Sequence, residues 1–143
     1  MFCLNYVEKH GDLFKMDNSY YLCHCISADF KLGKGIAVEF DRRYNMRKKL
    51  MEKFTVNGVY PRAVLIDNVF NLVTKDKYWN KPTYSTLQGA LEDMRNQIQV
   101  LQVKKLAMPC IGSGLDRLEW VKVRRMIKEI FNNGDIEIVV CIK

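Results

Sequence analysis

Strand-like apolar runs alternate with amphipathic stretches through the second half of the sequence, and this alternation limits the folds open to the chain. The apolar runs are residues 63–66, 69–74, 106–108 and 136–142. Residues 84–101 and 119–131 carry apolar side chains three and four positions apart, the spacing of a helix with one buried face. Strands and helices that alternate in this way pack as a sheet covered by helices. We therefore expect an α/β fold, a three-layer α/β/α sandwich.

The first half of the chain predicts two further strands and one long helix. Residues 3–7 and 20–26 are apolar enough for strands that are covered on both faces. A single helix is expected over residues 36–54. Its buried stripe would contain Ile36, Ala37, Phe40, Tyr44, Met51 and Phe54.

A short polar pair, Asp67 and Asn68, separates two β-rich runs and predicts a hairpin. The strands of a hairpin are antiparallel, whereas strands joined through a helix are usually parallel. The central sheet is therefore expected to be mixed.

Length and composition indicate one soluble globular domain over residues 1–143. The chain is long enough for one core and too short for two ordinary domains, and 48% of its residues are hydrophobic and 27% charged. No stretch approaches the about 18 to 20 apolar residues of a membrane helix, and no signal peptide is evident. We expect no membrane contact, a location in the cytoplasm or nucleus, and a monomer.

The net charge is +7, which attracts polyanions and phosphorylated ligands without naming the anion. Basic clusters at residues 42–43, 47–49 and 124–125 fit a solvated helix face or a nucleic-acid contact. The five cysteines are odd in number and lie in apolar surroundings, so we expect reduced thiols.

Two glycine loops are candidate phosphate-binding segments. One is residues 33–37, before the predicted helix at residue 36; the other is residues 111–116, between a strand and a helix. Glycines let successive backbone N–H groups face one anion, and helix N-termini favour the same charge. Neither loop matches a P-loop or the three-glycine dinucleotide fingerprint, so both of those nucleotide sites are excluded.

Lys75 and Asp116 are the candidate catalytic residues. Lys75 directly follows an apolar strand, and we expect the nearby Lys77 and Lys81, together with partial burial, to favour its neutral, nucleophilic amine. Asp116 ends the second glycine loop, where it could cap the next helix or act as a general acid and base.

Three other features admit a functional and a structural interpretation. Asp12 could accept a hydrogen bond from an exocyclic amine or could simply form a turn. Cys23 and Cys25 would share one face of a strand and His24 the other, which argues against a metal site. Cys110 has no identifiable partner histidine, so a packed thiol is the expected interpretation. No metal or organic cofactor is expected.

Four motifs in order make the chain resemble the macrodomain family, specifically its terminal ADP-ribose protein glycohydrolase subgroup. The motifs are residues 11–14 (GDLF), 24–27 (HCIS) followed by 33–38 (GKGIAV), 73–75 (VTK) with 81–84 (KPTY), and 108–118 (MPCIGSGLDRL) with Trp120. The resemblance spans nearly the whole chain and implies a macrodomain sandwich that binds ADP-ribose.

The resemblance also implies roles for individual residues. Lys75 would attack the distal ribose at C1″ and form a covalent lysyl-ADP-ribose, and Asp116 would assist as acid and base. Asp12 and Leu13 would lie at the adenine. The diphosphate and distal ribose would lie along Ser27, Gly33, Gly35, Ile36, Ala37, Cys110, Ile111, Gly112, Ser113, Gly114 and Leu115.

The expected acceptors are ADP-ribosylated glutamate and aspartate side chains, with O-acyl-ADP-ribose as a smaller substrate. Poly(ADP-ribose) and ADP-ribosylated nucleic acid are further expected partners, because some relatives act on ADP-ribosylated DNA. A non-catalytic ADP-ribose reader and a general nucleic-acid-binding domain are the competing functions. Lys34, a bulky residue between two glycines, departs from a simple phosphate loop and leaves the substrate fit open.

Overall fold

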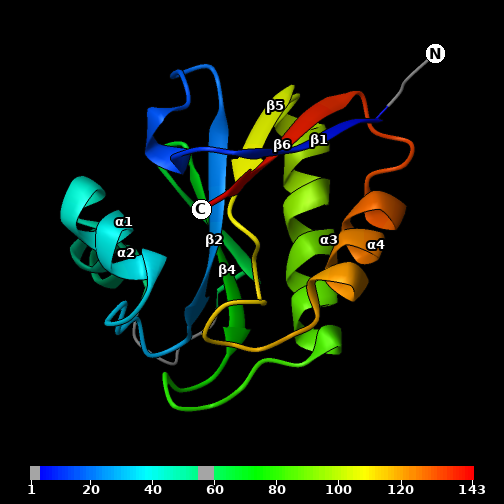
Figure 1. Cartoon of the computed structure of the whole chain (residues 1–143). Helices are drawn as coiled ribbons and strands as arrows, with labels where there is room; N and C mark the ends of the chain where they lie inside the picture. The colour runs from blue at the N-terminus through cyan, green and yellow to red at the C-terminus, as the bar shows by residue number, and fades with distance from the viewer. Residues whose placement is uncertain (1–3, 55–59) are drawn as a thin grey trace.

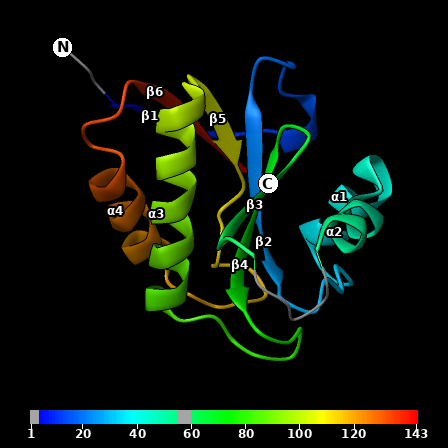
Figure 2. The same cartoon turned by 180° about the vertical axis from the view of Figure 1, so that it is seen from behind.

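The computed structural model describes residues 4–54 and 60–143, which form one six-stranded sheet between two layers of helices. The strands are β1 (Leu4–His10), β2 (Tyr21–Ser27), β3 (Ala63–Ile66), β4 (Val69–Lys75), β5 (Lys105–Met108) and β6 (Ile136–Ile142). The helices are α1 (Ile36–Tyr44), α2 (Met46–Lys53), α3 (Tyr84–Leu101) and α4 (Trp120–Ile130). Helices α1 and α2 cover one face of the sheet and α3 and α4 the other (Figures 1 and 2). The expected α/β/α sandwich is confirmed.

The strand order is β1-β6-β5-β2-β4-β3, and only β3 runs antiparallel to its neighbour. β3 and β4 form the predicted hairpin, whose turn places Asp67 at a φ of 54°. The sheet is therefore mixed, as expected. Because the other five strands are parallel, their carboxyl ends share one edge of the sheet, and the loops that follow them surround that edge.

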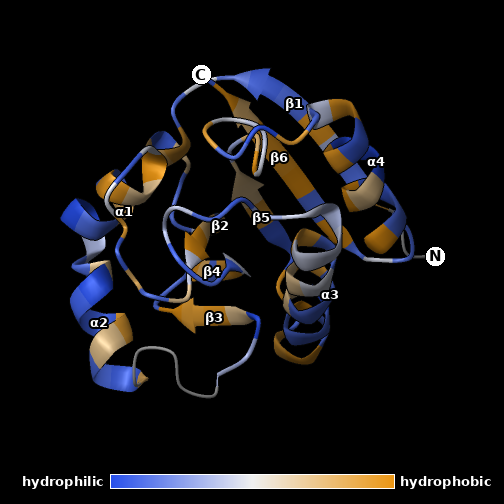
Figure 3. Ribbon diagram, turned by 90° about the horizontal axis from the view of Figure 1, so that it is seen from below, coloured by the Kyte–Doolittle hydropathy of each residue, from blue (hydrophilic) through white to orange (hydrophobic). Residues whose placement is uncertain are grey.

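Each face of the sheet has its own apolar core. β2 shows the division, because Cys23 and Cys25 belong to the core beneath α3 and α4 whereas His24 stacks on Phe40 of α1. The predicted alternation of thiols and imidazole is confirmed. In Figure 3 the inner strands are mostly hydrophobic and the outer turns of α2 are hydrophilic. Among the described residues, no helix is long and apolar enough to cross a membrane.

The single helix predicted over residues 36–54 is wrong, because Asn45 breaks it into α1 and α2. Asn45 adopts the left-handed conformation, with φ 55° and ψ 43°, which asparagine tolerates better than most residues. The break changes which side chains face the core: Met46 and Leu50 are buried, whereas the predicted Met51 is exposed. Other boundaries shift by one to three residues, the largest at the end of the first strand, which runs to His10 and not to residue 7. Cys3, the predicted start of that strand, lies outside the described residues.

Candidate active site

Lys75 and Asp116 form an ion pair at the carboxyl edge of the sheet. The Lys75 Nζ atom lies 3.0 Å from Asp116 Oδ1, and the two side chains retain 16% and 17% of their exposure. Both groups are thus shielded from most of the solvent but still accessible. Asp116 does not cap the following helix, so that interpretation is wrong; Glu119 occupies the N-cap position of α4 without a side-chain capping bond.

Backbone contacts hold this pair in place. Lys75 ends β4, and its carbonyl accepts a hydrogen bond of 2.8 Å from the Ala28 N–H, just after β2. Asp116 lies in a tight loop closed by a 2.7 Å bond from the Leu118 N–H to the Gly112 carbonyl. Gly112 has a φ of 74°, and an added Cβ would come within 3.1 Å of Leu118. A glycine is therefore required where the loop turns toward Lys75.

The charged surroundings of Lys75 differ from the prediction. The expected neighbour Lys81 donates its own hydrogen bond to the Leu115 carbonyl, at 3.1 Å, and Asp116 is the ion partner of Lys75. The charged group paired with the Lys75 amine is thus a carboxylate and not one of the two lysines of the prediction.

The two glycine loops meet across the site. A Cβ on Gly35 would lie 3.3 Å from the Leu115 side chain, so the N-terminus of α1 and the loop after β5 are in near contact. Gly35 is the N-cap residue of α1, with a φ of 61°. Of the predicted phosphate-contacting residues, some are exposed and others half-buried or buried. The exposed ones are Gly33, Gly35, Gly114 and Leu115; Ile36, Cys110 and Ser113 are half-buried; Ala37, Ile111 and Gly112 are buried.

Ser27 is buried, and its hydroxyl donates a 2.5 Å hydrogen bond to Asp29. Asp29 also accepts bonds from the backbone N–H groups of Lys31 and Tyr78, so it joins the loop after β2 to the loop after β4. Burial alone would raise the pKa of Asp29, but these hydrogen bonds hold it below its usual range. Asp29 was missed as a site residue, although its place two residues after a serine is typical of a side chain that organises a turn.

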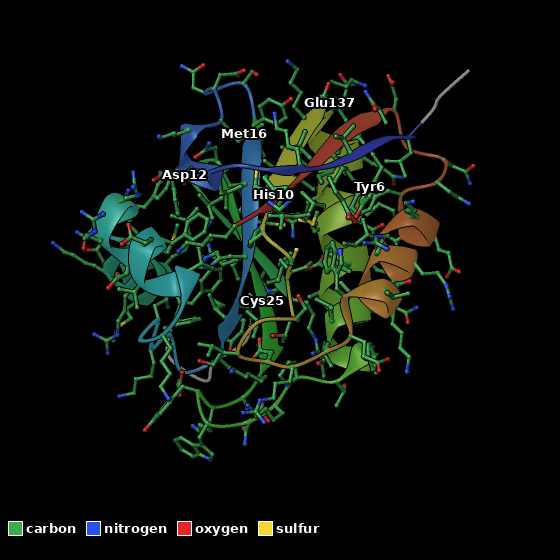
Figure 4. The ribbon with its side chains drawn as sticks, viewed as in Figure 1. Tyr6, His10, Asp12, Met16, Cys25 and Glu137 are labelled. Atoms are coloured by element: carbon green, nitrogen blue, oxygen red, sulfur yellow. The ribbon has the colours of Figure 1, made fainter. Side chains whose placement is uncertain are left out.

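Asp12 is exposed, and its carboxylate accepts a 2.9 Å hydrogen bond from the Phe14 N–H at the start of a 3₁₀ helix, Leu13–Lys15. The turn-forming role is therefore present, and it leaves the second carboxylate oxygen for other contacts. Leu13 is buried beneath this turn. Figure 4 shows Asp12 beyond the end of β1, well away from Cys25 on the lower part of β2. β1 is an edge strand, and β4, which carries Lys75, lies beyond β2 in the strand order, so Asp12 and the ion pair lie toward opposite sides of the sheet.

Cys25 was also missed as part of the site. Burial raises the pKa of its thiol to about 12, and the nearby Asp116 carboxylate adds to the rise. Burial likewise raises the pKa of Cys110, which fits a packed thiol rather than a nucleophile. Within residues 4–54 and 60–143, no three His, Cys, Asp or Glu side chains are grouped as metal ligands.

The fold and the sequence both match known proteins. The macrodomain of Thermus aquaticus DarG superposes with a TM-score of 0.74 and 25% identity over 99% of both chains. The human ADP-ribose glycohydrolase OARD1 is 40% identical over 140 residues, which are 96% of this chain and 90% of the human protein. The chain belongs to the macrodomain family. The identity to OARD1 also confirms the predicted subgroup, the terminal ADP-ribose glycohydrolases.

Other solved macrodomains support the same fold. The macrodomain of Mycobacterium tuberculosis DarG has a TM-score of 0.82 and 22% identity over 99% of this macrodomain and 98% of that chain. Thermosipho africanus DarTG, solved in complex with ADP-ribose, has a TM-score of 0.76 and 17% identity over 97% of this macrodomain and 42% of that chain. No protein-family model matches the sequence.

Proposed function

We propose that this macrodomain hydrolyses ADP-ribose from modified glutamate and aspartate side chains, with O-acyl-ADP-ribose as a smaller substrate. The observation that carries the proposal is the 3.0 Å pair of Lys75 and Asp116, shielded but accessible, at the edge where loops of an α/β sheet bind ligands. The similarity to OARD1, an ADP-ribose glycohydrolase, supports the same activity.

The proposed ligand spans the carboxyl edge from Asp12 to Lys75. The adenine would lie at Asp12 and Leu13, where a carboxylate oxygen can accept from an exocyclic amine. The diphosphate would lie between the α1 N-terminus at Gly35 and the Gly112–Gly114 segment, whose N–H groups and helix dipole favour an anion. The distal ribose would then reach the ion pair.

Two steps complete the proposed reaction. Asp116 takes a proton from the Lys75 ammonium; the neutral amine attacks C1″, the bond from C1″ to the acceptor oxygen breaks, and the acceptor leaves as a carboxylate. Once Asp116 has released this proton to solvent, it acts as general base for a water that attacks C1″ of the lysyl-ADP-ribose; the C1″–N bond breaks, the lysine nitrogen leaves as an amine, and Asp116 returns a proton to it. The products are free ADP-ribose and the restored acceptor.

The test is release of ADP-ribose from a peptide carrying one glutamate-linked ADP-ribose. We expect Lys75→Ala to lower the rate about 10³-fold or more, as loss of a nucleophile does, and Asp116→Ala to lower it about 10²- to 10⁴-fold, as loss of an acid and base does. Both variants should still bind free ADP-ribose. Lys104→Ala is the matched control. It also removes a lysine from an ion pair, the exposed pair in which Lys104 Nζ lies 3.2 Å from Asp135 Oδ2, but this pair is outside the site.

Unchanged release in both variants would refute the proposed mechanism. Tight binding of ADP-ribose without release by the parent protein would instead identify a reader module. Trapping the lysyl-ADP-ribose in the parent, by denaturing the reaction and measuring protein mass, gives an independent check on the covalent step.

The adenine end has its own test. We expect Asp12→Ala to weaken the binding of free ADP-ribose by about 10-fold, since one hydrogen bond to a charged group contributes about 1.5 kcal/mol or more. Asp12→Asn keeps an acceptor for the Phe14 N–H, so a loss of affinity in this variant comes from the ligand contact and not from the turn. Unchanged affinity in both variants, measured by calorimetry, would place the adenine elsewhere.

A further inference from the structure

Two large aromatic side chains, three and four residues after Lys75, are exposed to solvent. Tyr78 and Trp79 are 49% and 64% exposed, and within the described part of the chain they are the only aromatic residues among its exposed large hydrophobics. Their rings meet edge to face, with centroids 5.0 Å apart. Edge-to-face contact leaves ring faces uncovered, so apolar surface remains available to a ligand.

The loop that carries them is anchored at several points. The Tyr78 N–H donates to Asp29 at 2.9 Å, which joins the loop to the end of β2. Within the loop, the Lys77 N–H donates to the Asn80 side chain at 2.9 Å, and the Asn80 N–H donates to the Lys77 carbonyl at 3.0 Å. Lys81 reaches the Leu115 carbonyl on the second glycine loop. Hydrogen bonds therefore hold this loop against the segment after β2 and against the second glycine loop, with both rings exposed.

The position of the loop assigns it to the acceptor side. If Lys75 attacks C1″, the acceptor bonded to that atom also lies near Lys75, and residues 76–81 follow Lys75 in the chain. Lys31, Lys77 and Lys81 lie on the two joined loops, against the acidic Asp29 and Asp76. The three lysines outnumber these two carboxylates, so the named charged groups carry a net positive charge.

We propose that Tyr78 and Trp79 form a stacking platform for a base that flanks an ADP-ribosylated nucleotide in a single-stranded nucleic acid. The inference rests on the proposed attack by Lys75, takes ADP-ribosylated nucleic acid from the expected partners, and assigns the residues that hold its flanking base. Bases stack on exposed aromatic rings whatever their sequence, and lysines beside the rings neutralise the phosphates of the same strand. An acidic peptide would use the lysines but would leave the open ring faces without a matching planar group.

The first test compares three substrates of the intact protein. One is a single-stranded oligonucleotide with one ADP-ribosylated base, the second has abasic sites on both sides of that base, and the third is the glutamate-linked peptide. We expect Trp79→Ala to raise KM for the first substrate about 10- to 100-fold, the range of one lost stacking contact, with little change in kcat. Trp79→Phe should restore most of the loss, and neither variant should alter the other two substrates.

Val100→Ala is the matched control, because Val100 is 83% exposed on α3, outside the site. An equal rise in KM for oligonucleotide and peptide would show a general acceptor surface and overturn the nucleic-acid proposal. An unchanged KM for the first substrate in Trp79→Ala and Tyr78→Ala would also overturn it.

A binding experiment separates this inference from the proposed reaction. Unmodified oligothymidylate should quench the tryptophan fluorescence of the Lys75→Ala protein, and the quenching should be lost in the Lys75→Ala, Trp79→Phe double variant, which retains Trp120. Absence of turnover by the parent protein on every substrate, with the quenching intact in the Lys75→Ala protein, would refute the reaction alone. Absence of quenching in the Lys75→Ala protein would refute the platform.

Discussion

Two polar pairs lie along β2 and β4, and they differ in charge and in burial. In the middle of the strands His24 and Asn71 are register partners, both fully buried, and His24 Nε2 lies 2.6 Å from Asn71 Oδ1. At the end of β4, Lys75 pairs with Asp116 and retains access to solvent. The inner pair is neutral and enclosed within the protein, whereas the outer pair is charged and accessible to solvent. The pair buried in the middle of the strands contributes to the stability of the fold, whereas the pair at the strand end is accessible to a ligand.

The inner pair connects the sheet to α1. The Asn71 amide donates to the Val64 carbonyl at 3.1 Å, and the His24 ring stacks on Phe40 with centroids 3.9 Å apart. Since Asn71 Oδ1 accepts, the His24 proton resides on Nε2; Nδ1 has no hydrogen-bond partner among the described residues. Burial lowers the pKa of His24 to about 4, although the bond to Asn71 acts in the opposite direction.

The largest expected effect is on stability in acid. The pKa of His24 falls from its ordinary 6.5 to about 4 on folding, so between these values the unfolded chain binds a proton that the folded chain does not. The stability is therefore complete above pH 6.5 and is lost as the pH falls toward 4, by about 3 kcal/mol in the free energy of unfolding. Urea unfolding at a series of pH values measures the loss.

His24→Leu is the control, because it keeps an apolar side chain against Phe40 and removes the titrating ring. Acidic groups will still cause some loss in this variant, since hydrogen bonds hold the pKa of Glu8 and Asp29 below their usual range. An equal loss of stability in the parent and in His24→Leu between pH 6.5 and 4 would contradict the assignment of this effect to His24.

A smaller effect is expected from Asn71→Leu at neutral pH. The substitution leaves the buried His24 N–H without its acceptor, so the free energy of unfolding should fall by about 2 kcal/mol. Turnover at a temperature where the variant is folded should not change. Asn132→Leu, at an exposed position, is the reference and should stay within about 0.5 kcal/mol of the parent. Lost turnover in folded Asn71→Leu would contradict a purely structural role.

The smallest effect on stability is expected from the outer pair. Lys75→Ala removes an ion pair that solvent partly screens, so the free energy of unfolding should change by only about 1 kcal/mol, although turnover is lost. The melting temperatures of Lys75→Ala and the double variant with Asp116→Ala measure this directly. A loss as large as that of Asn71→Leu would mean that the outer pair also stabilises the fold.

Much of the fold could be predicted because its signals are local. The hairpin at Asp67 and the helix over Tyr84–Leu101 follow from spacing and turn chemistry within a few residues. The break at Asn45 was missed because the apolar spacing continues past it, and only the packing of Met46 and Leu50 against the core shows where the second helix begins. Ser27, Gly35 and Asp12 could be nominated from their motifs, but the bonds of Asp29 to distant backbone could not.

The amino-acid pattern alone determined the layers, the mixed sheet and the two glycine loops, since each depends on periodicity or on neighbouring residues. Only the tertiary structure decided that Asp116 meets Lys75 rather than capping a helix, and that Lys81 turns to Leu115. The partners in each contact are more than thirty positions apart, and strand order and loop closure bring them together. No local preference encodes such a meeting.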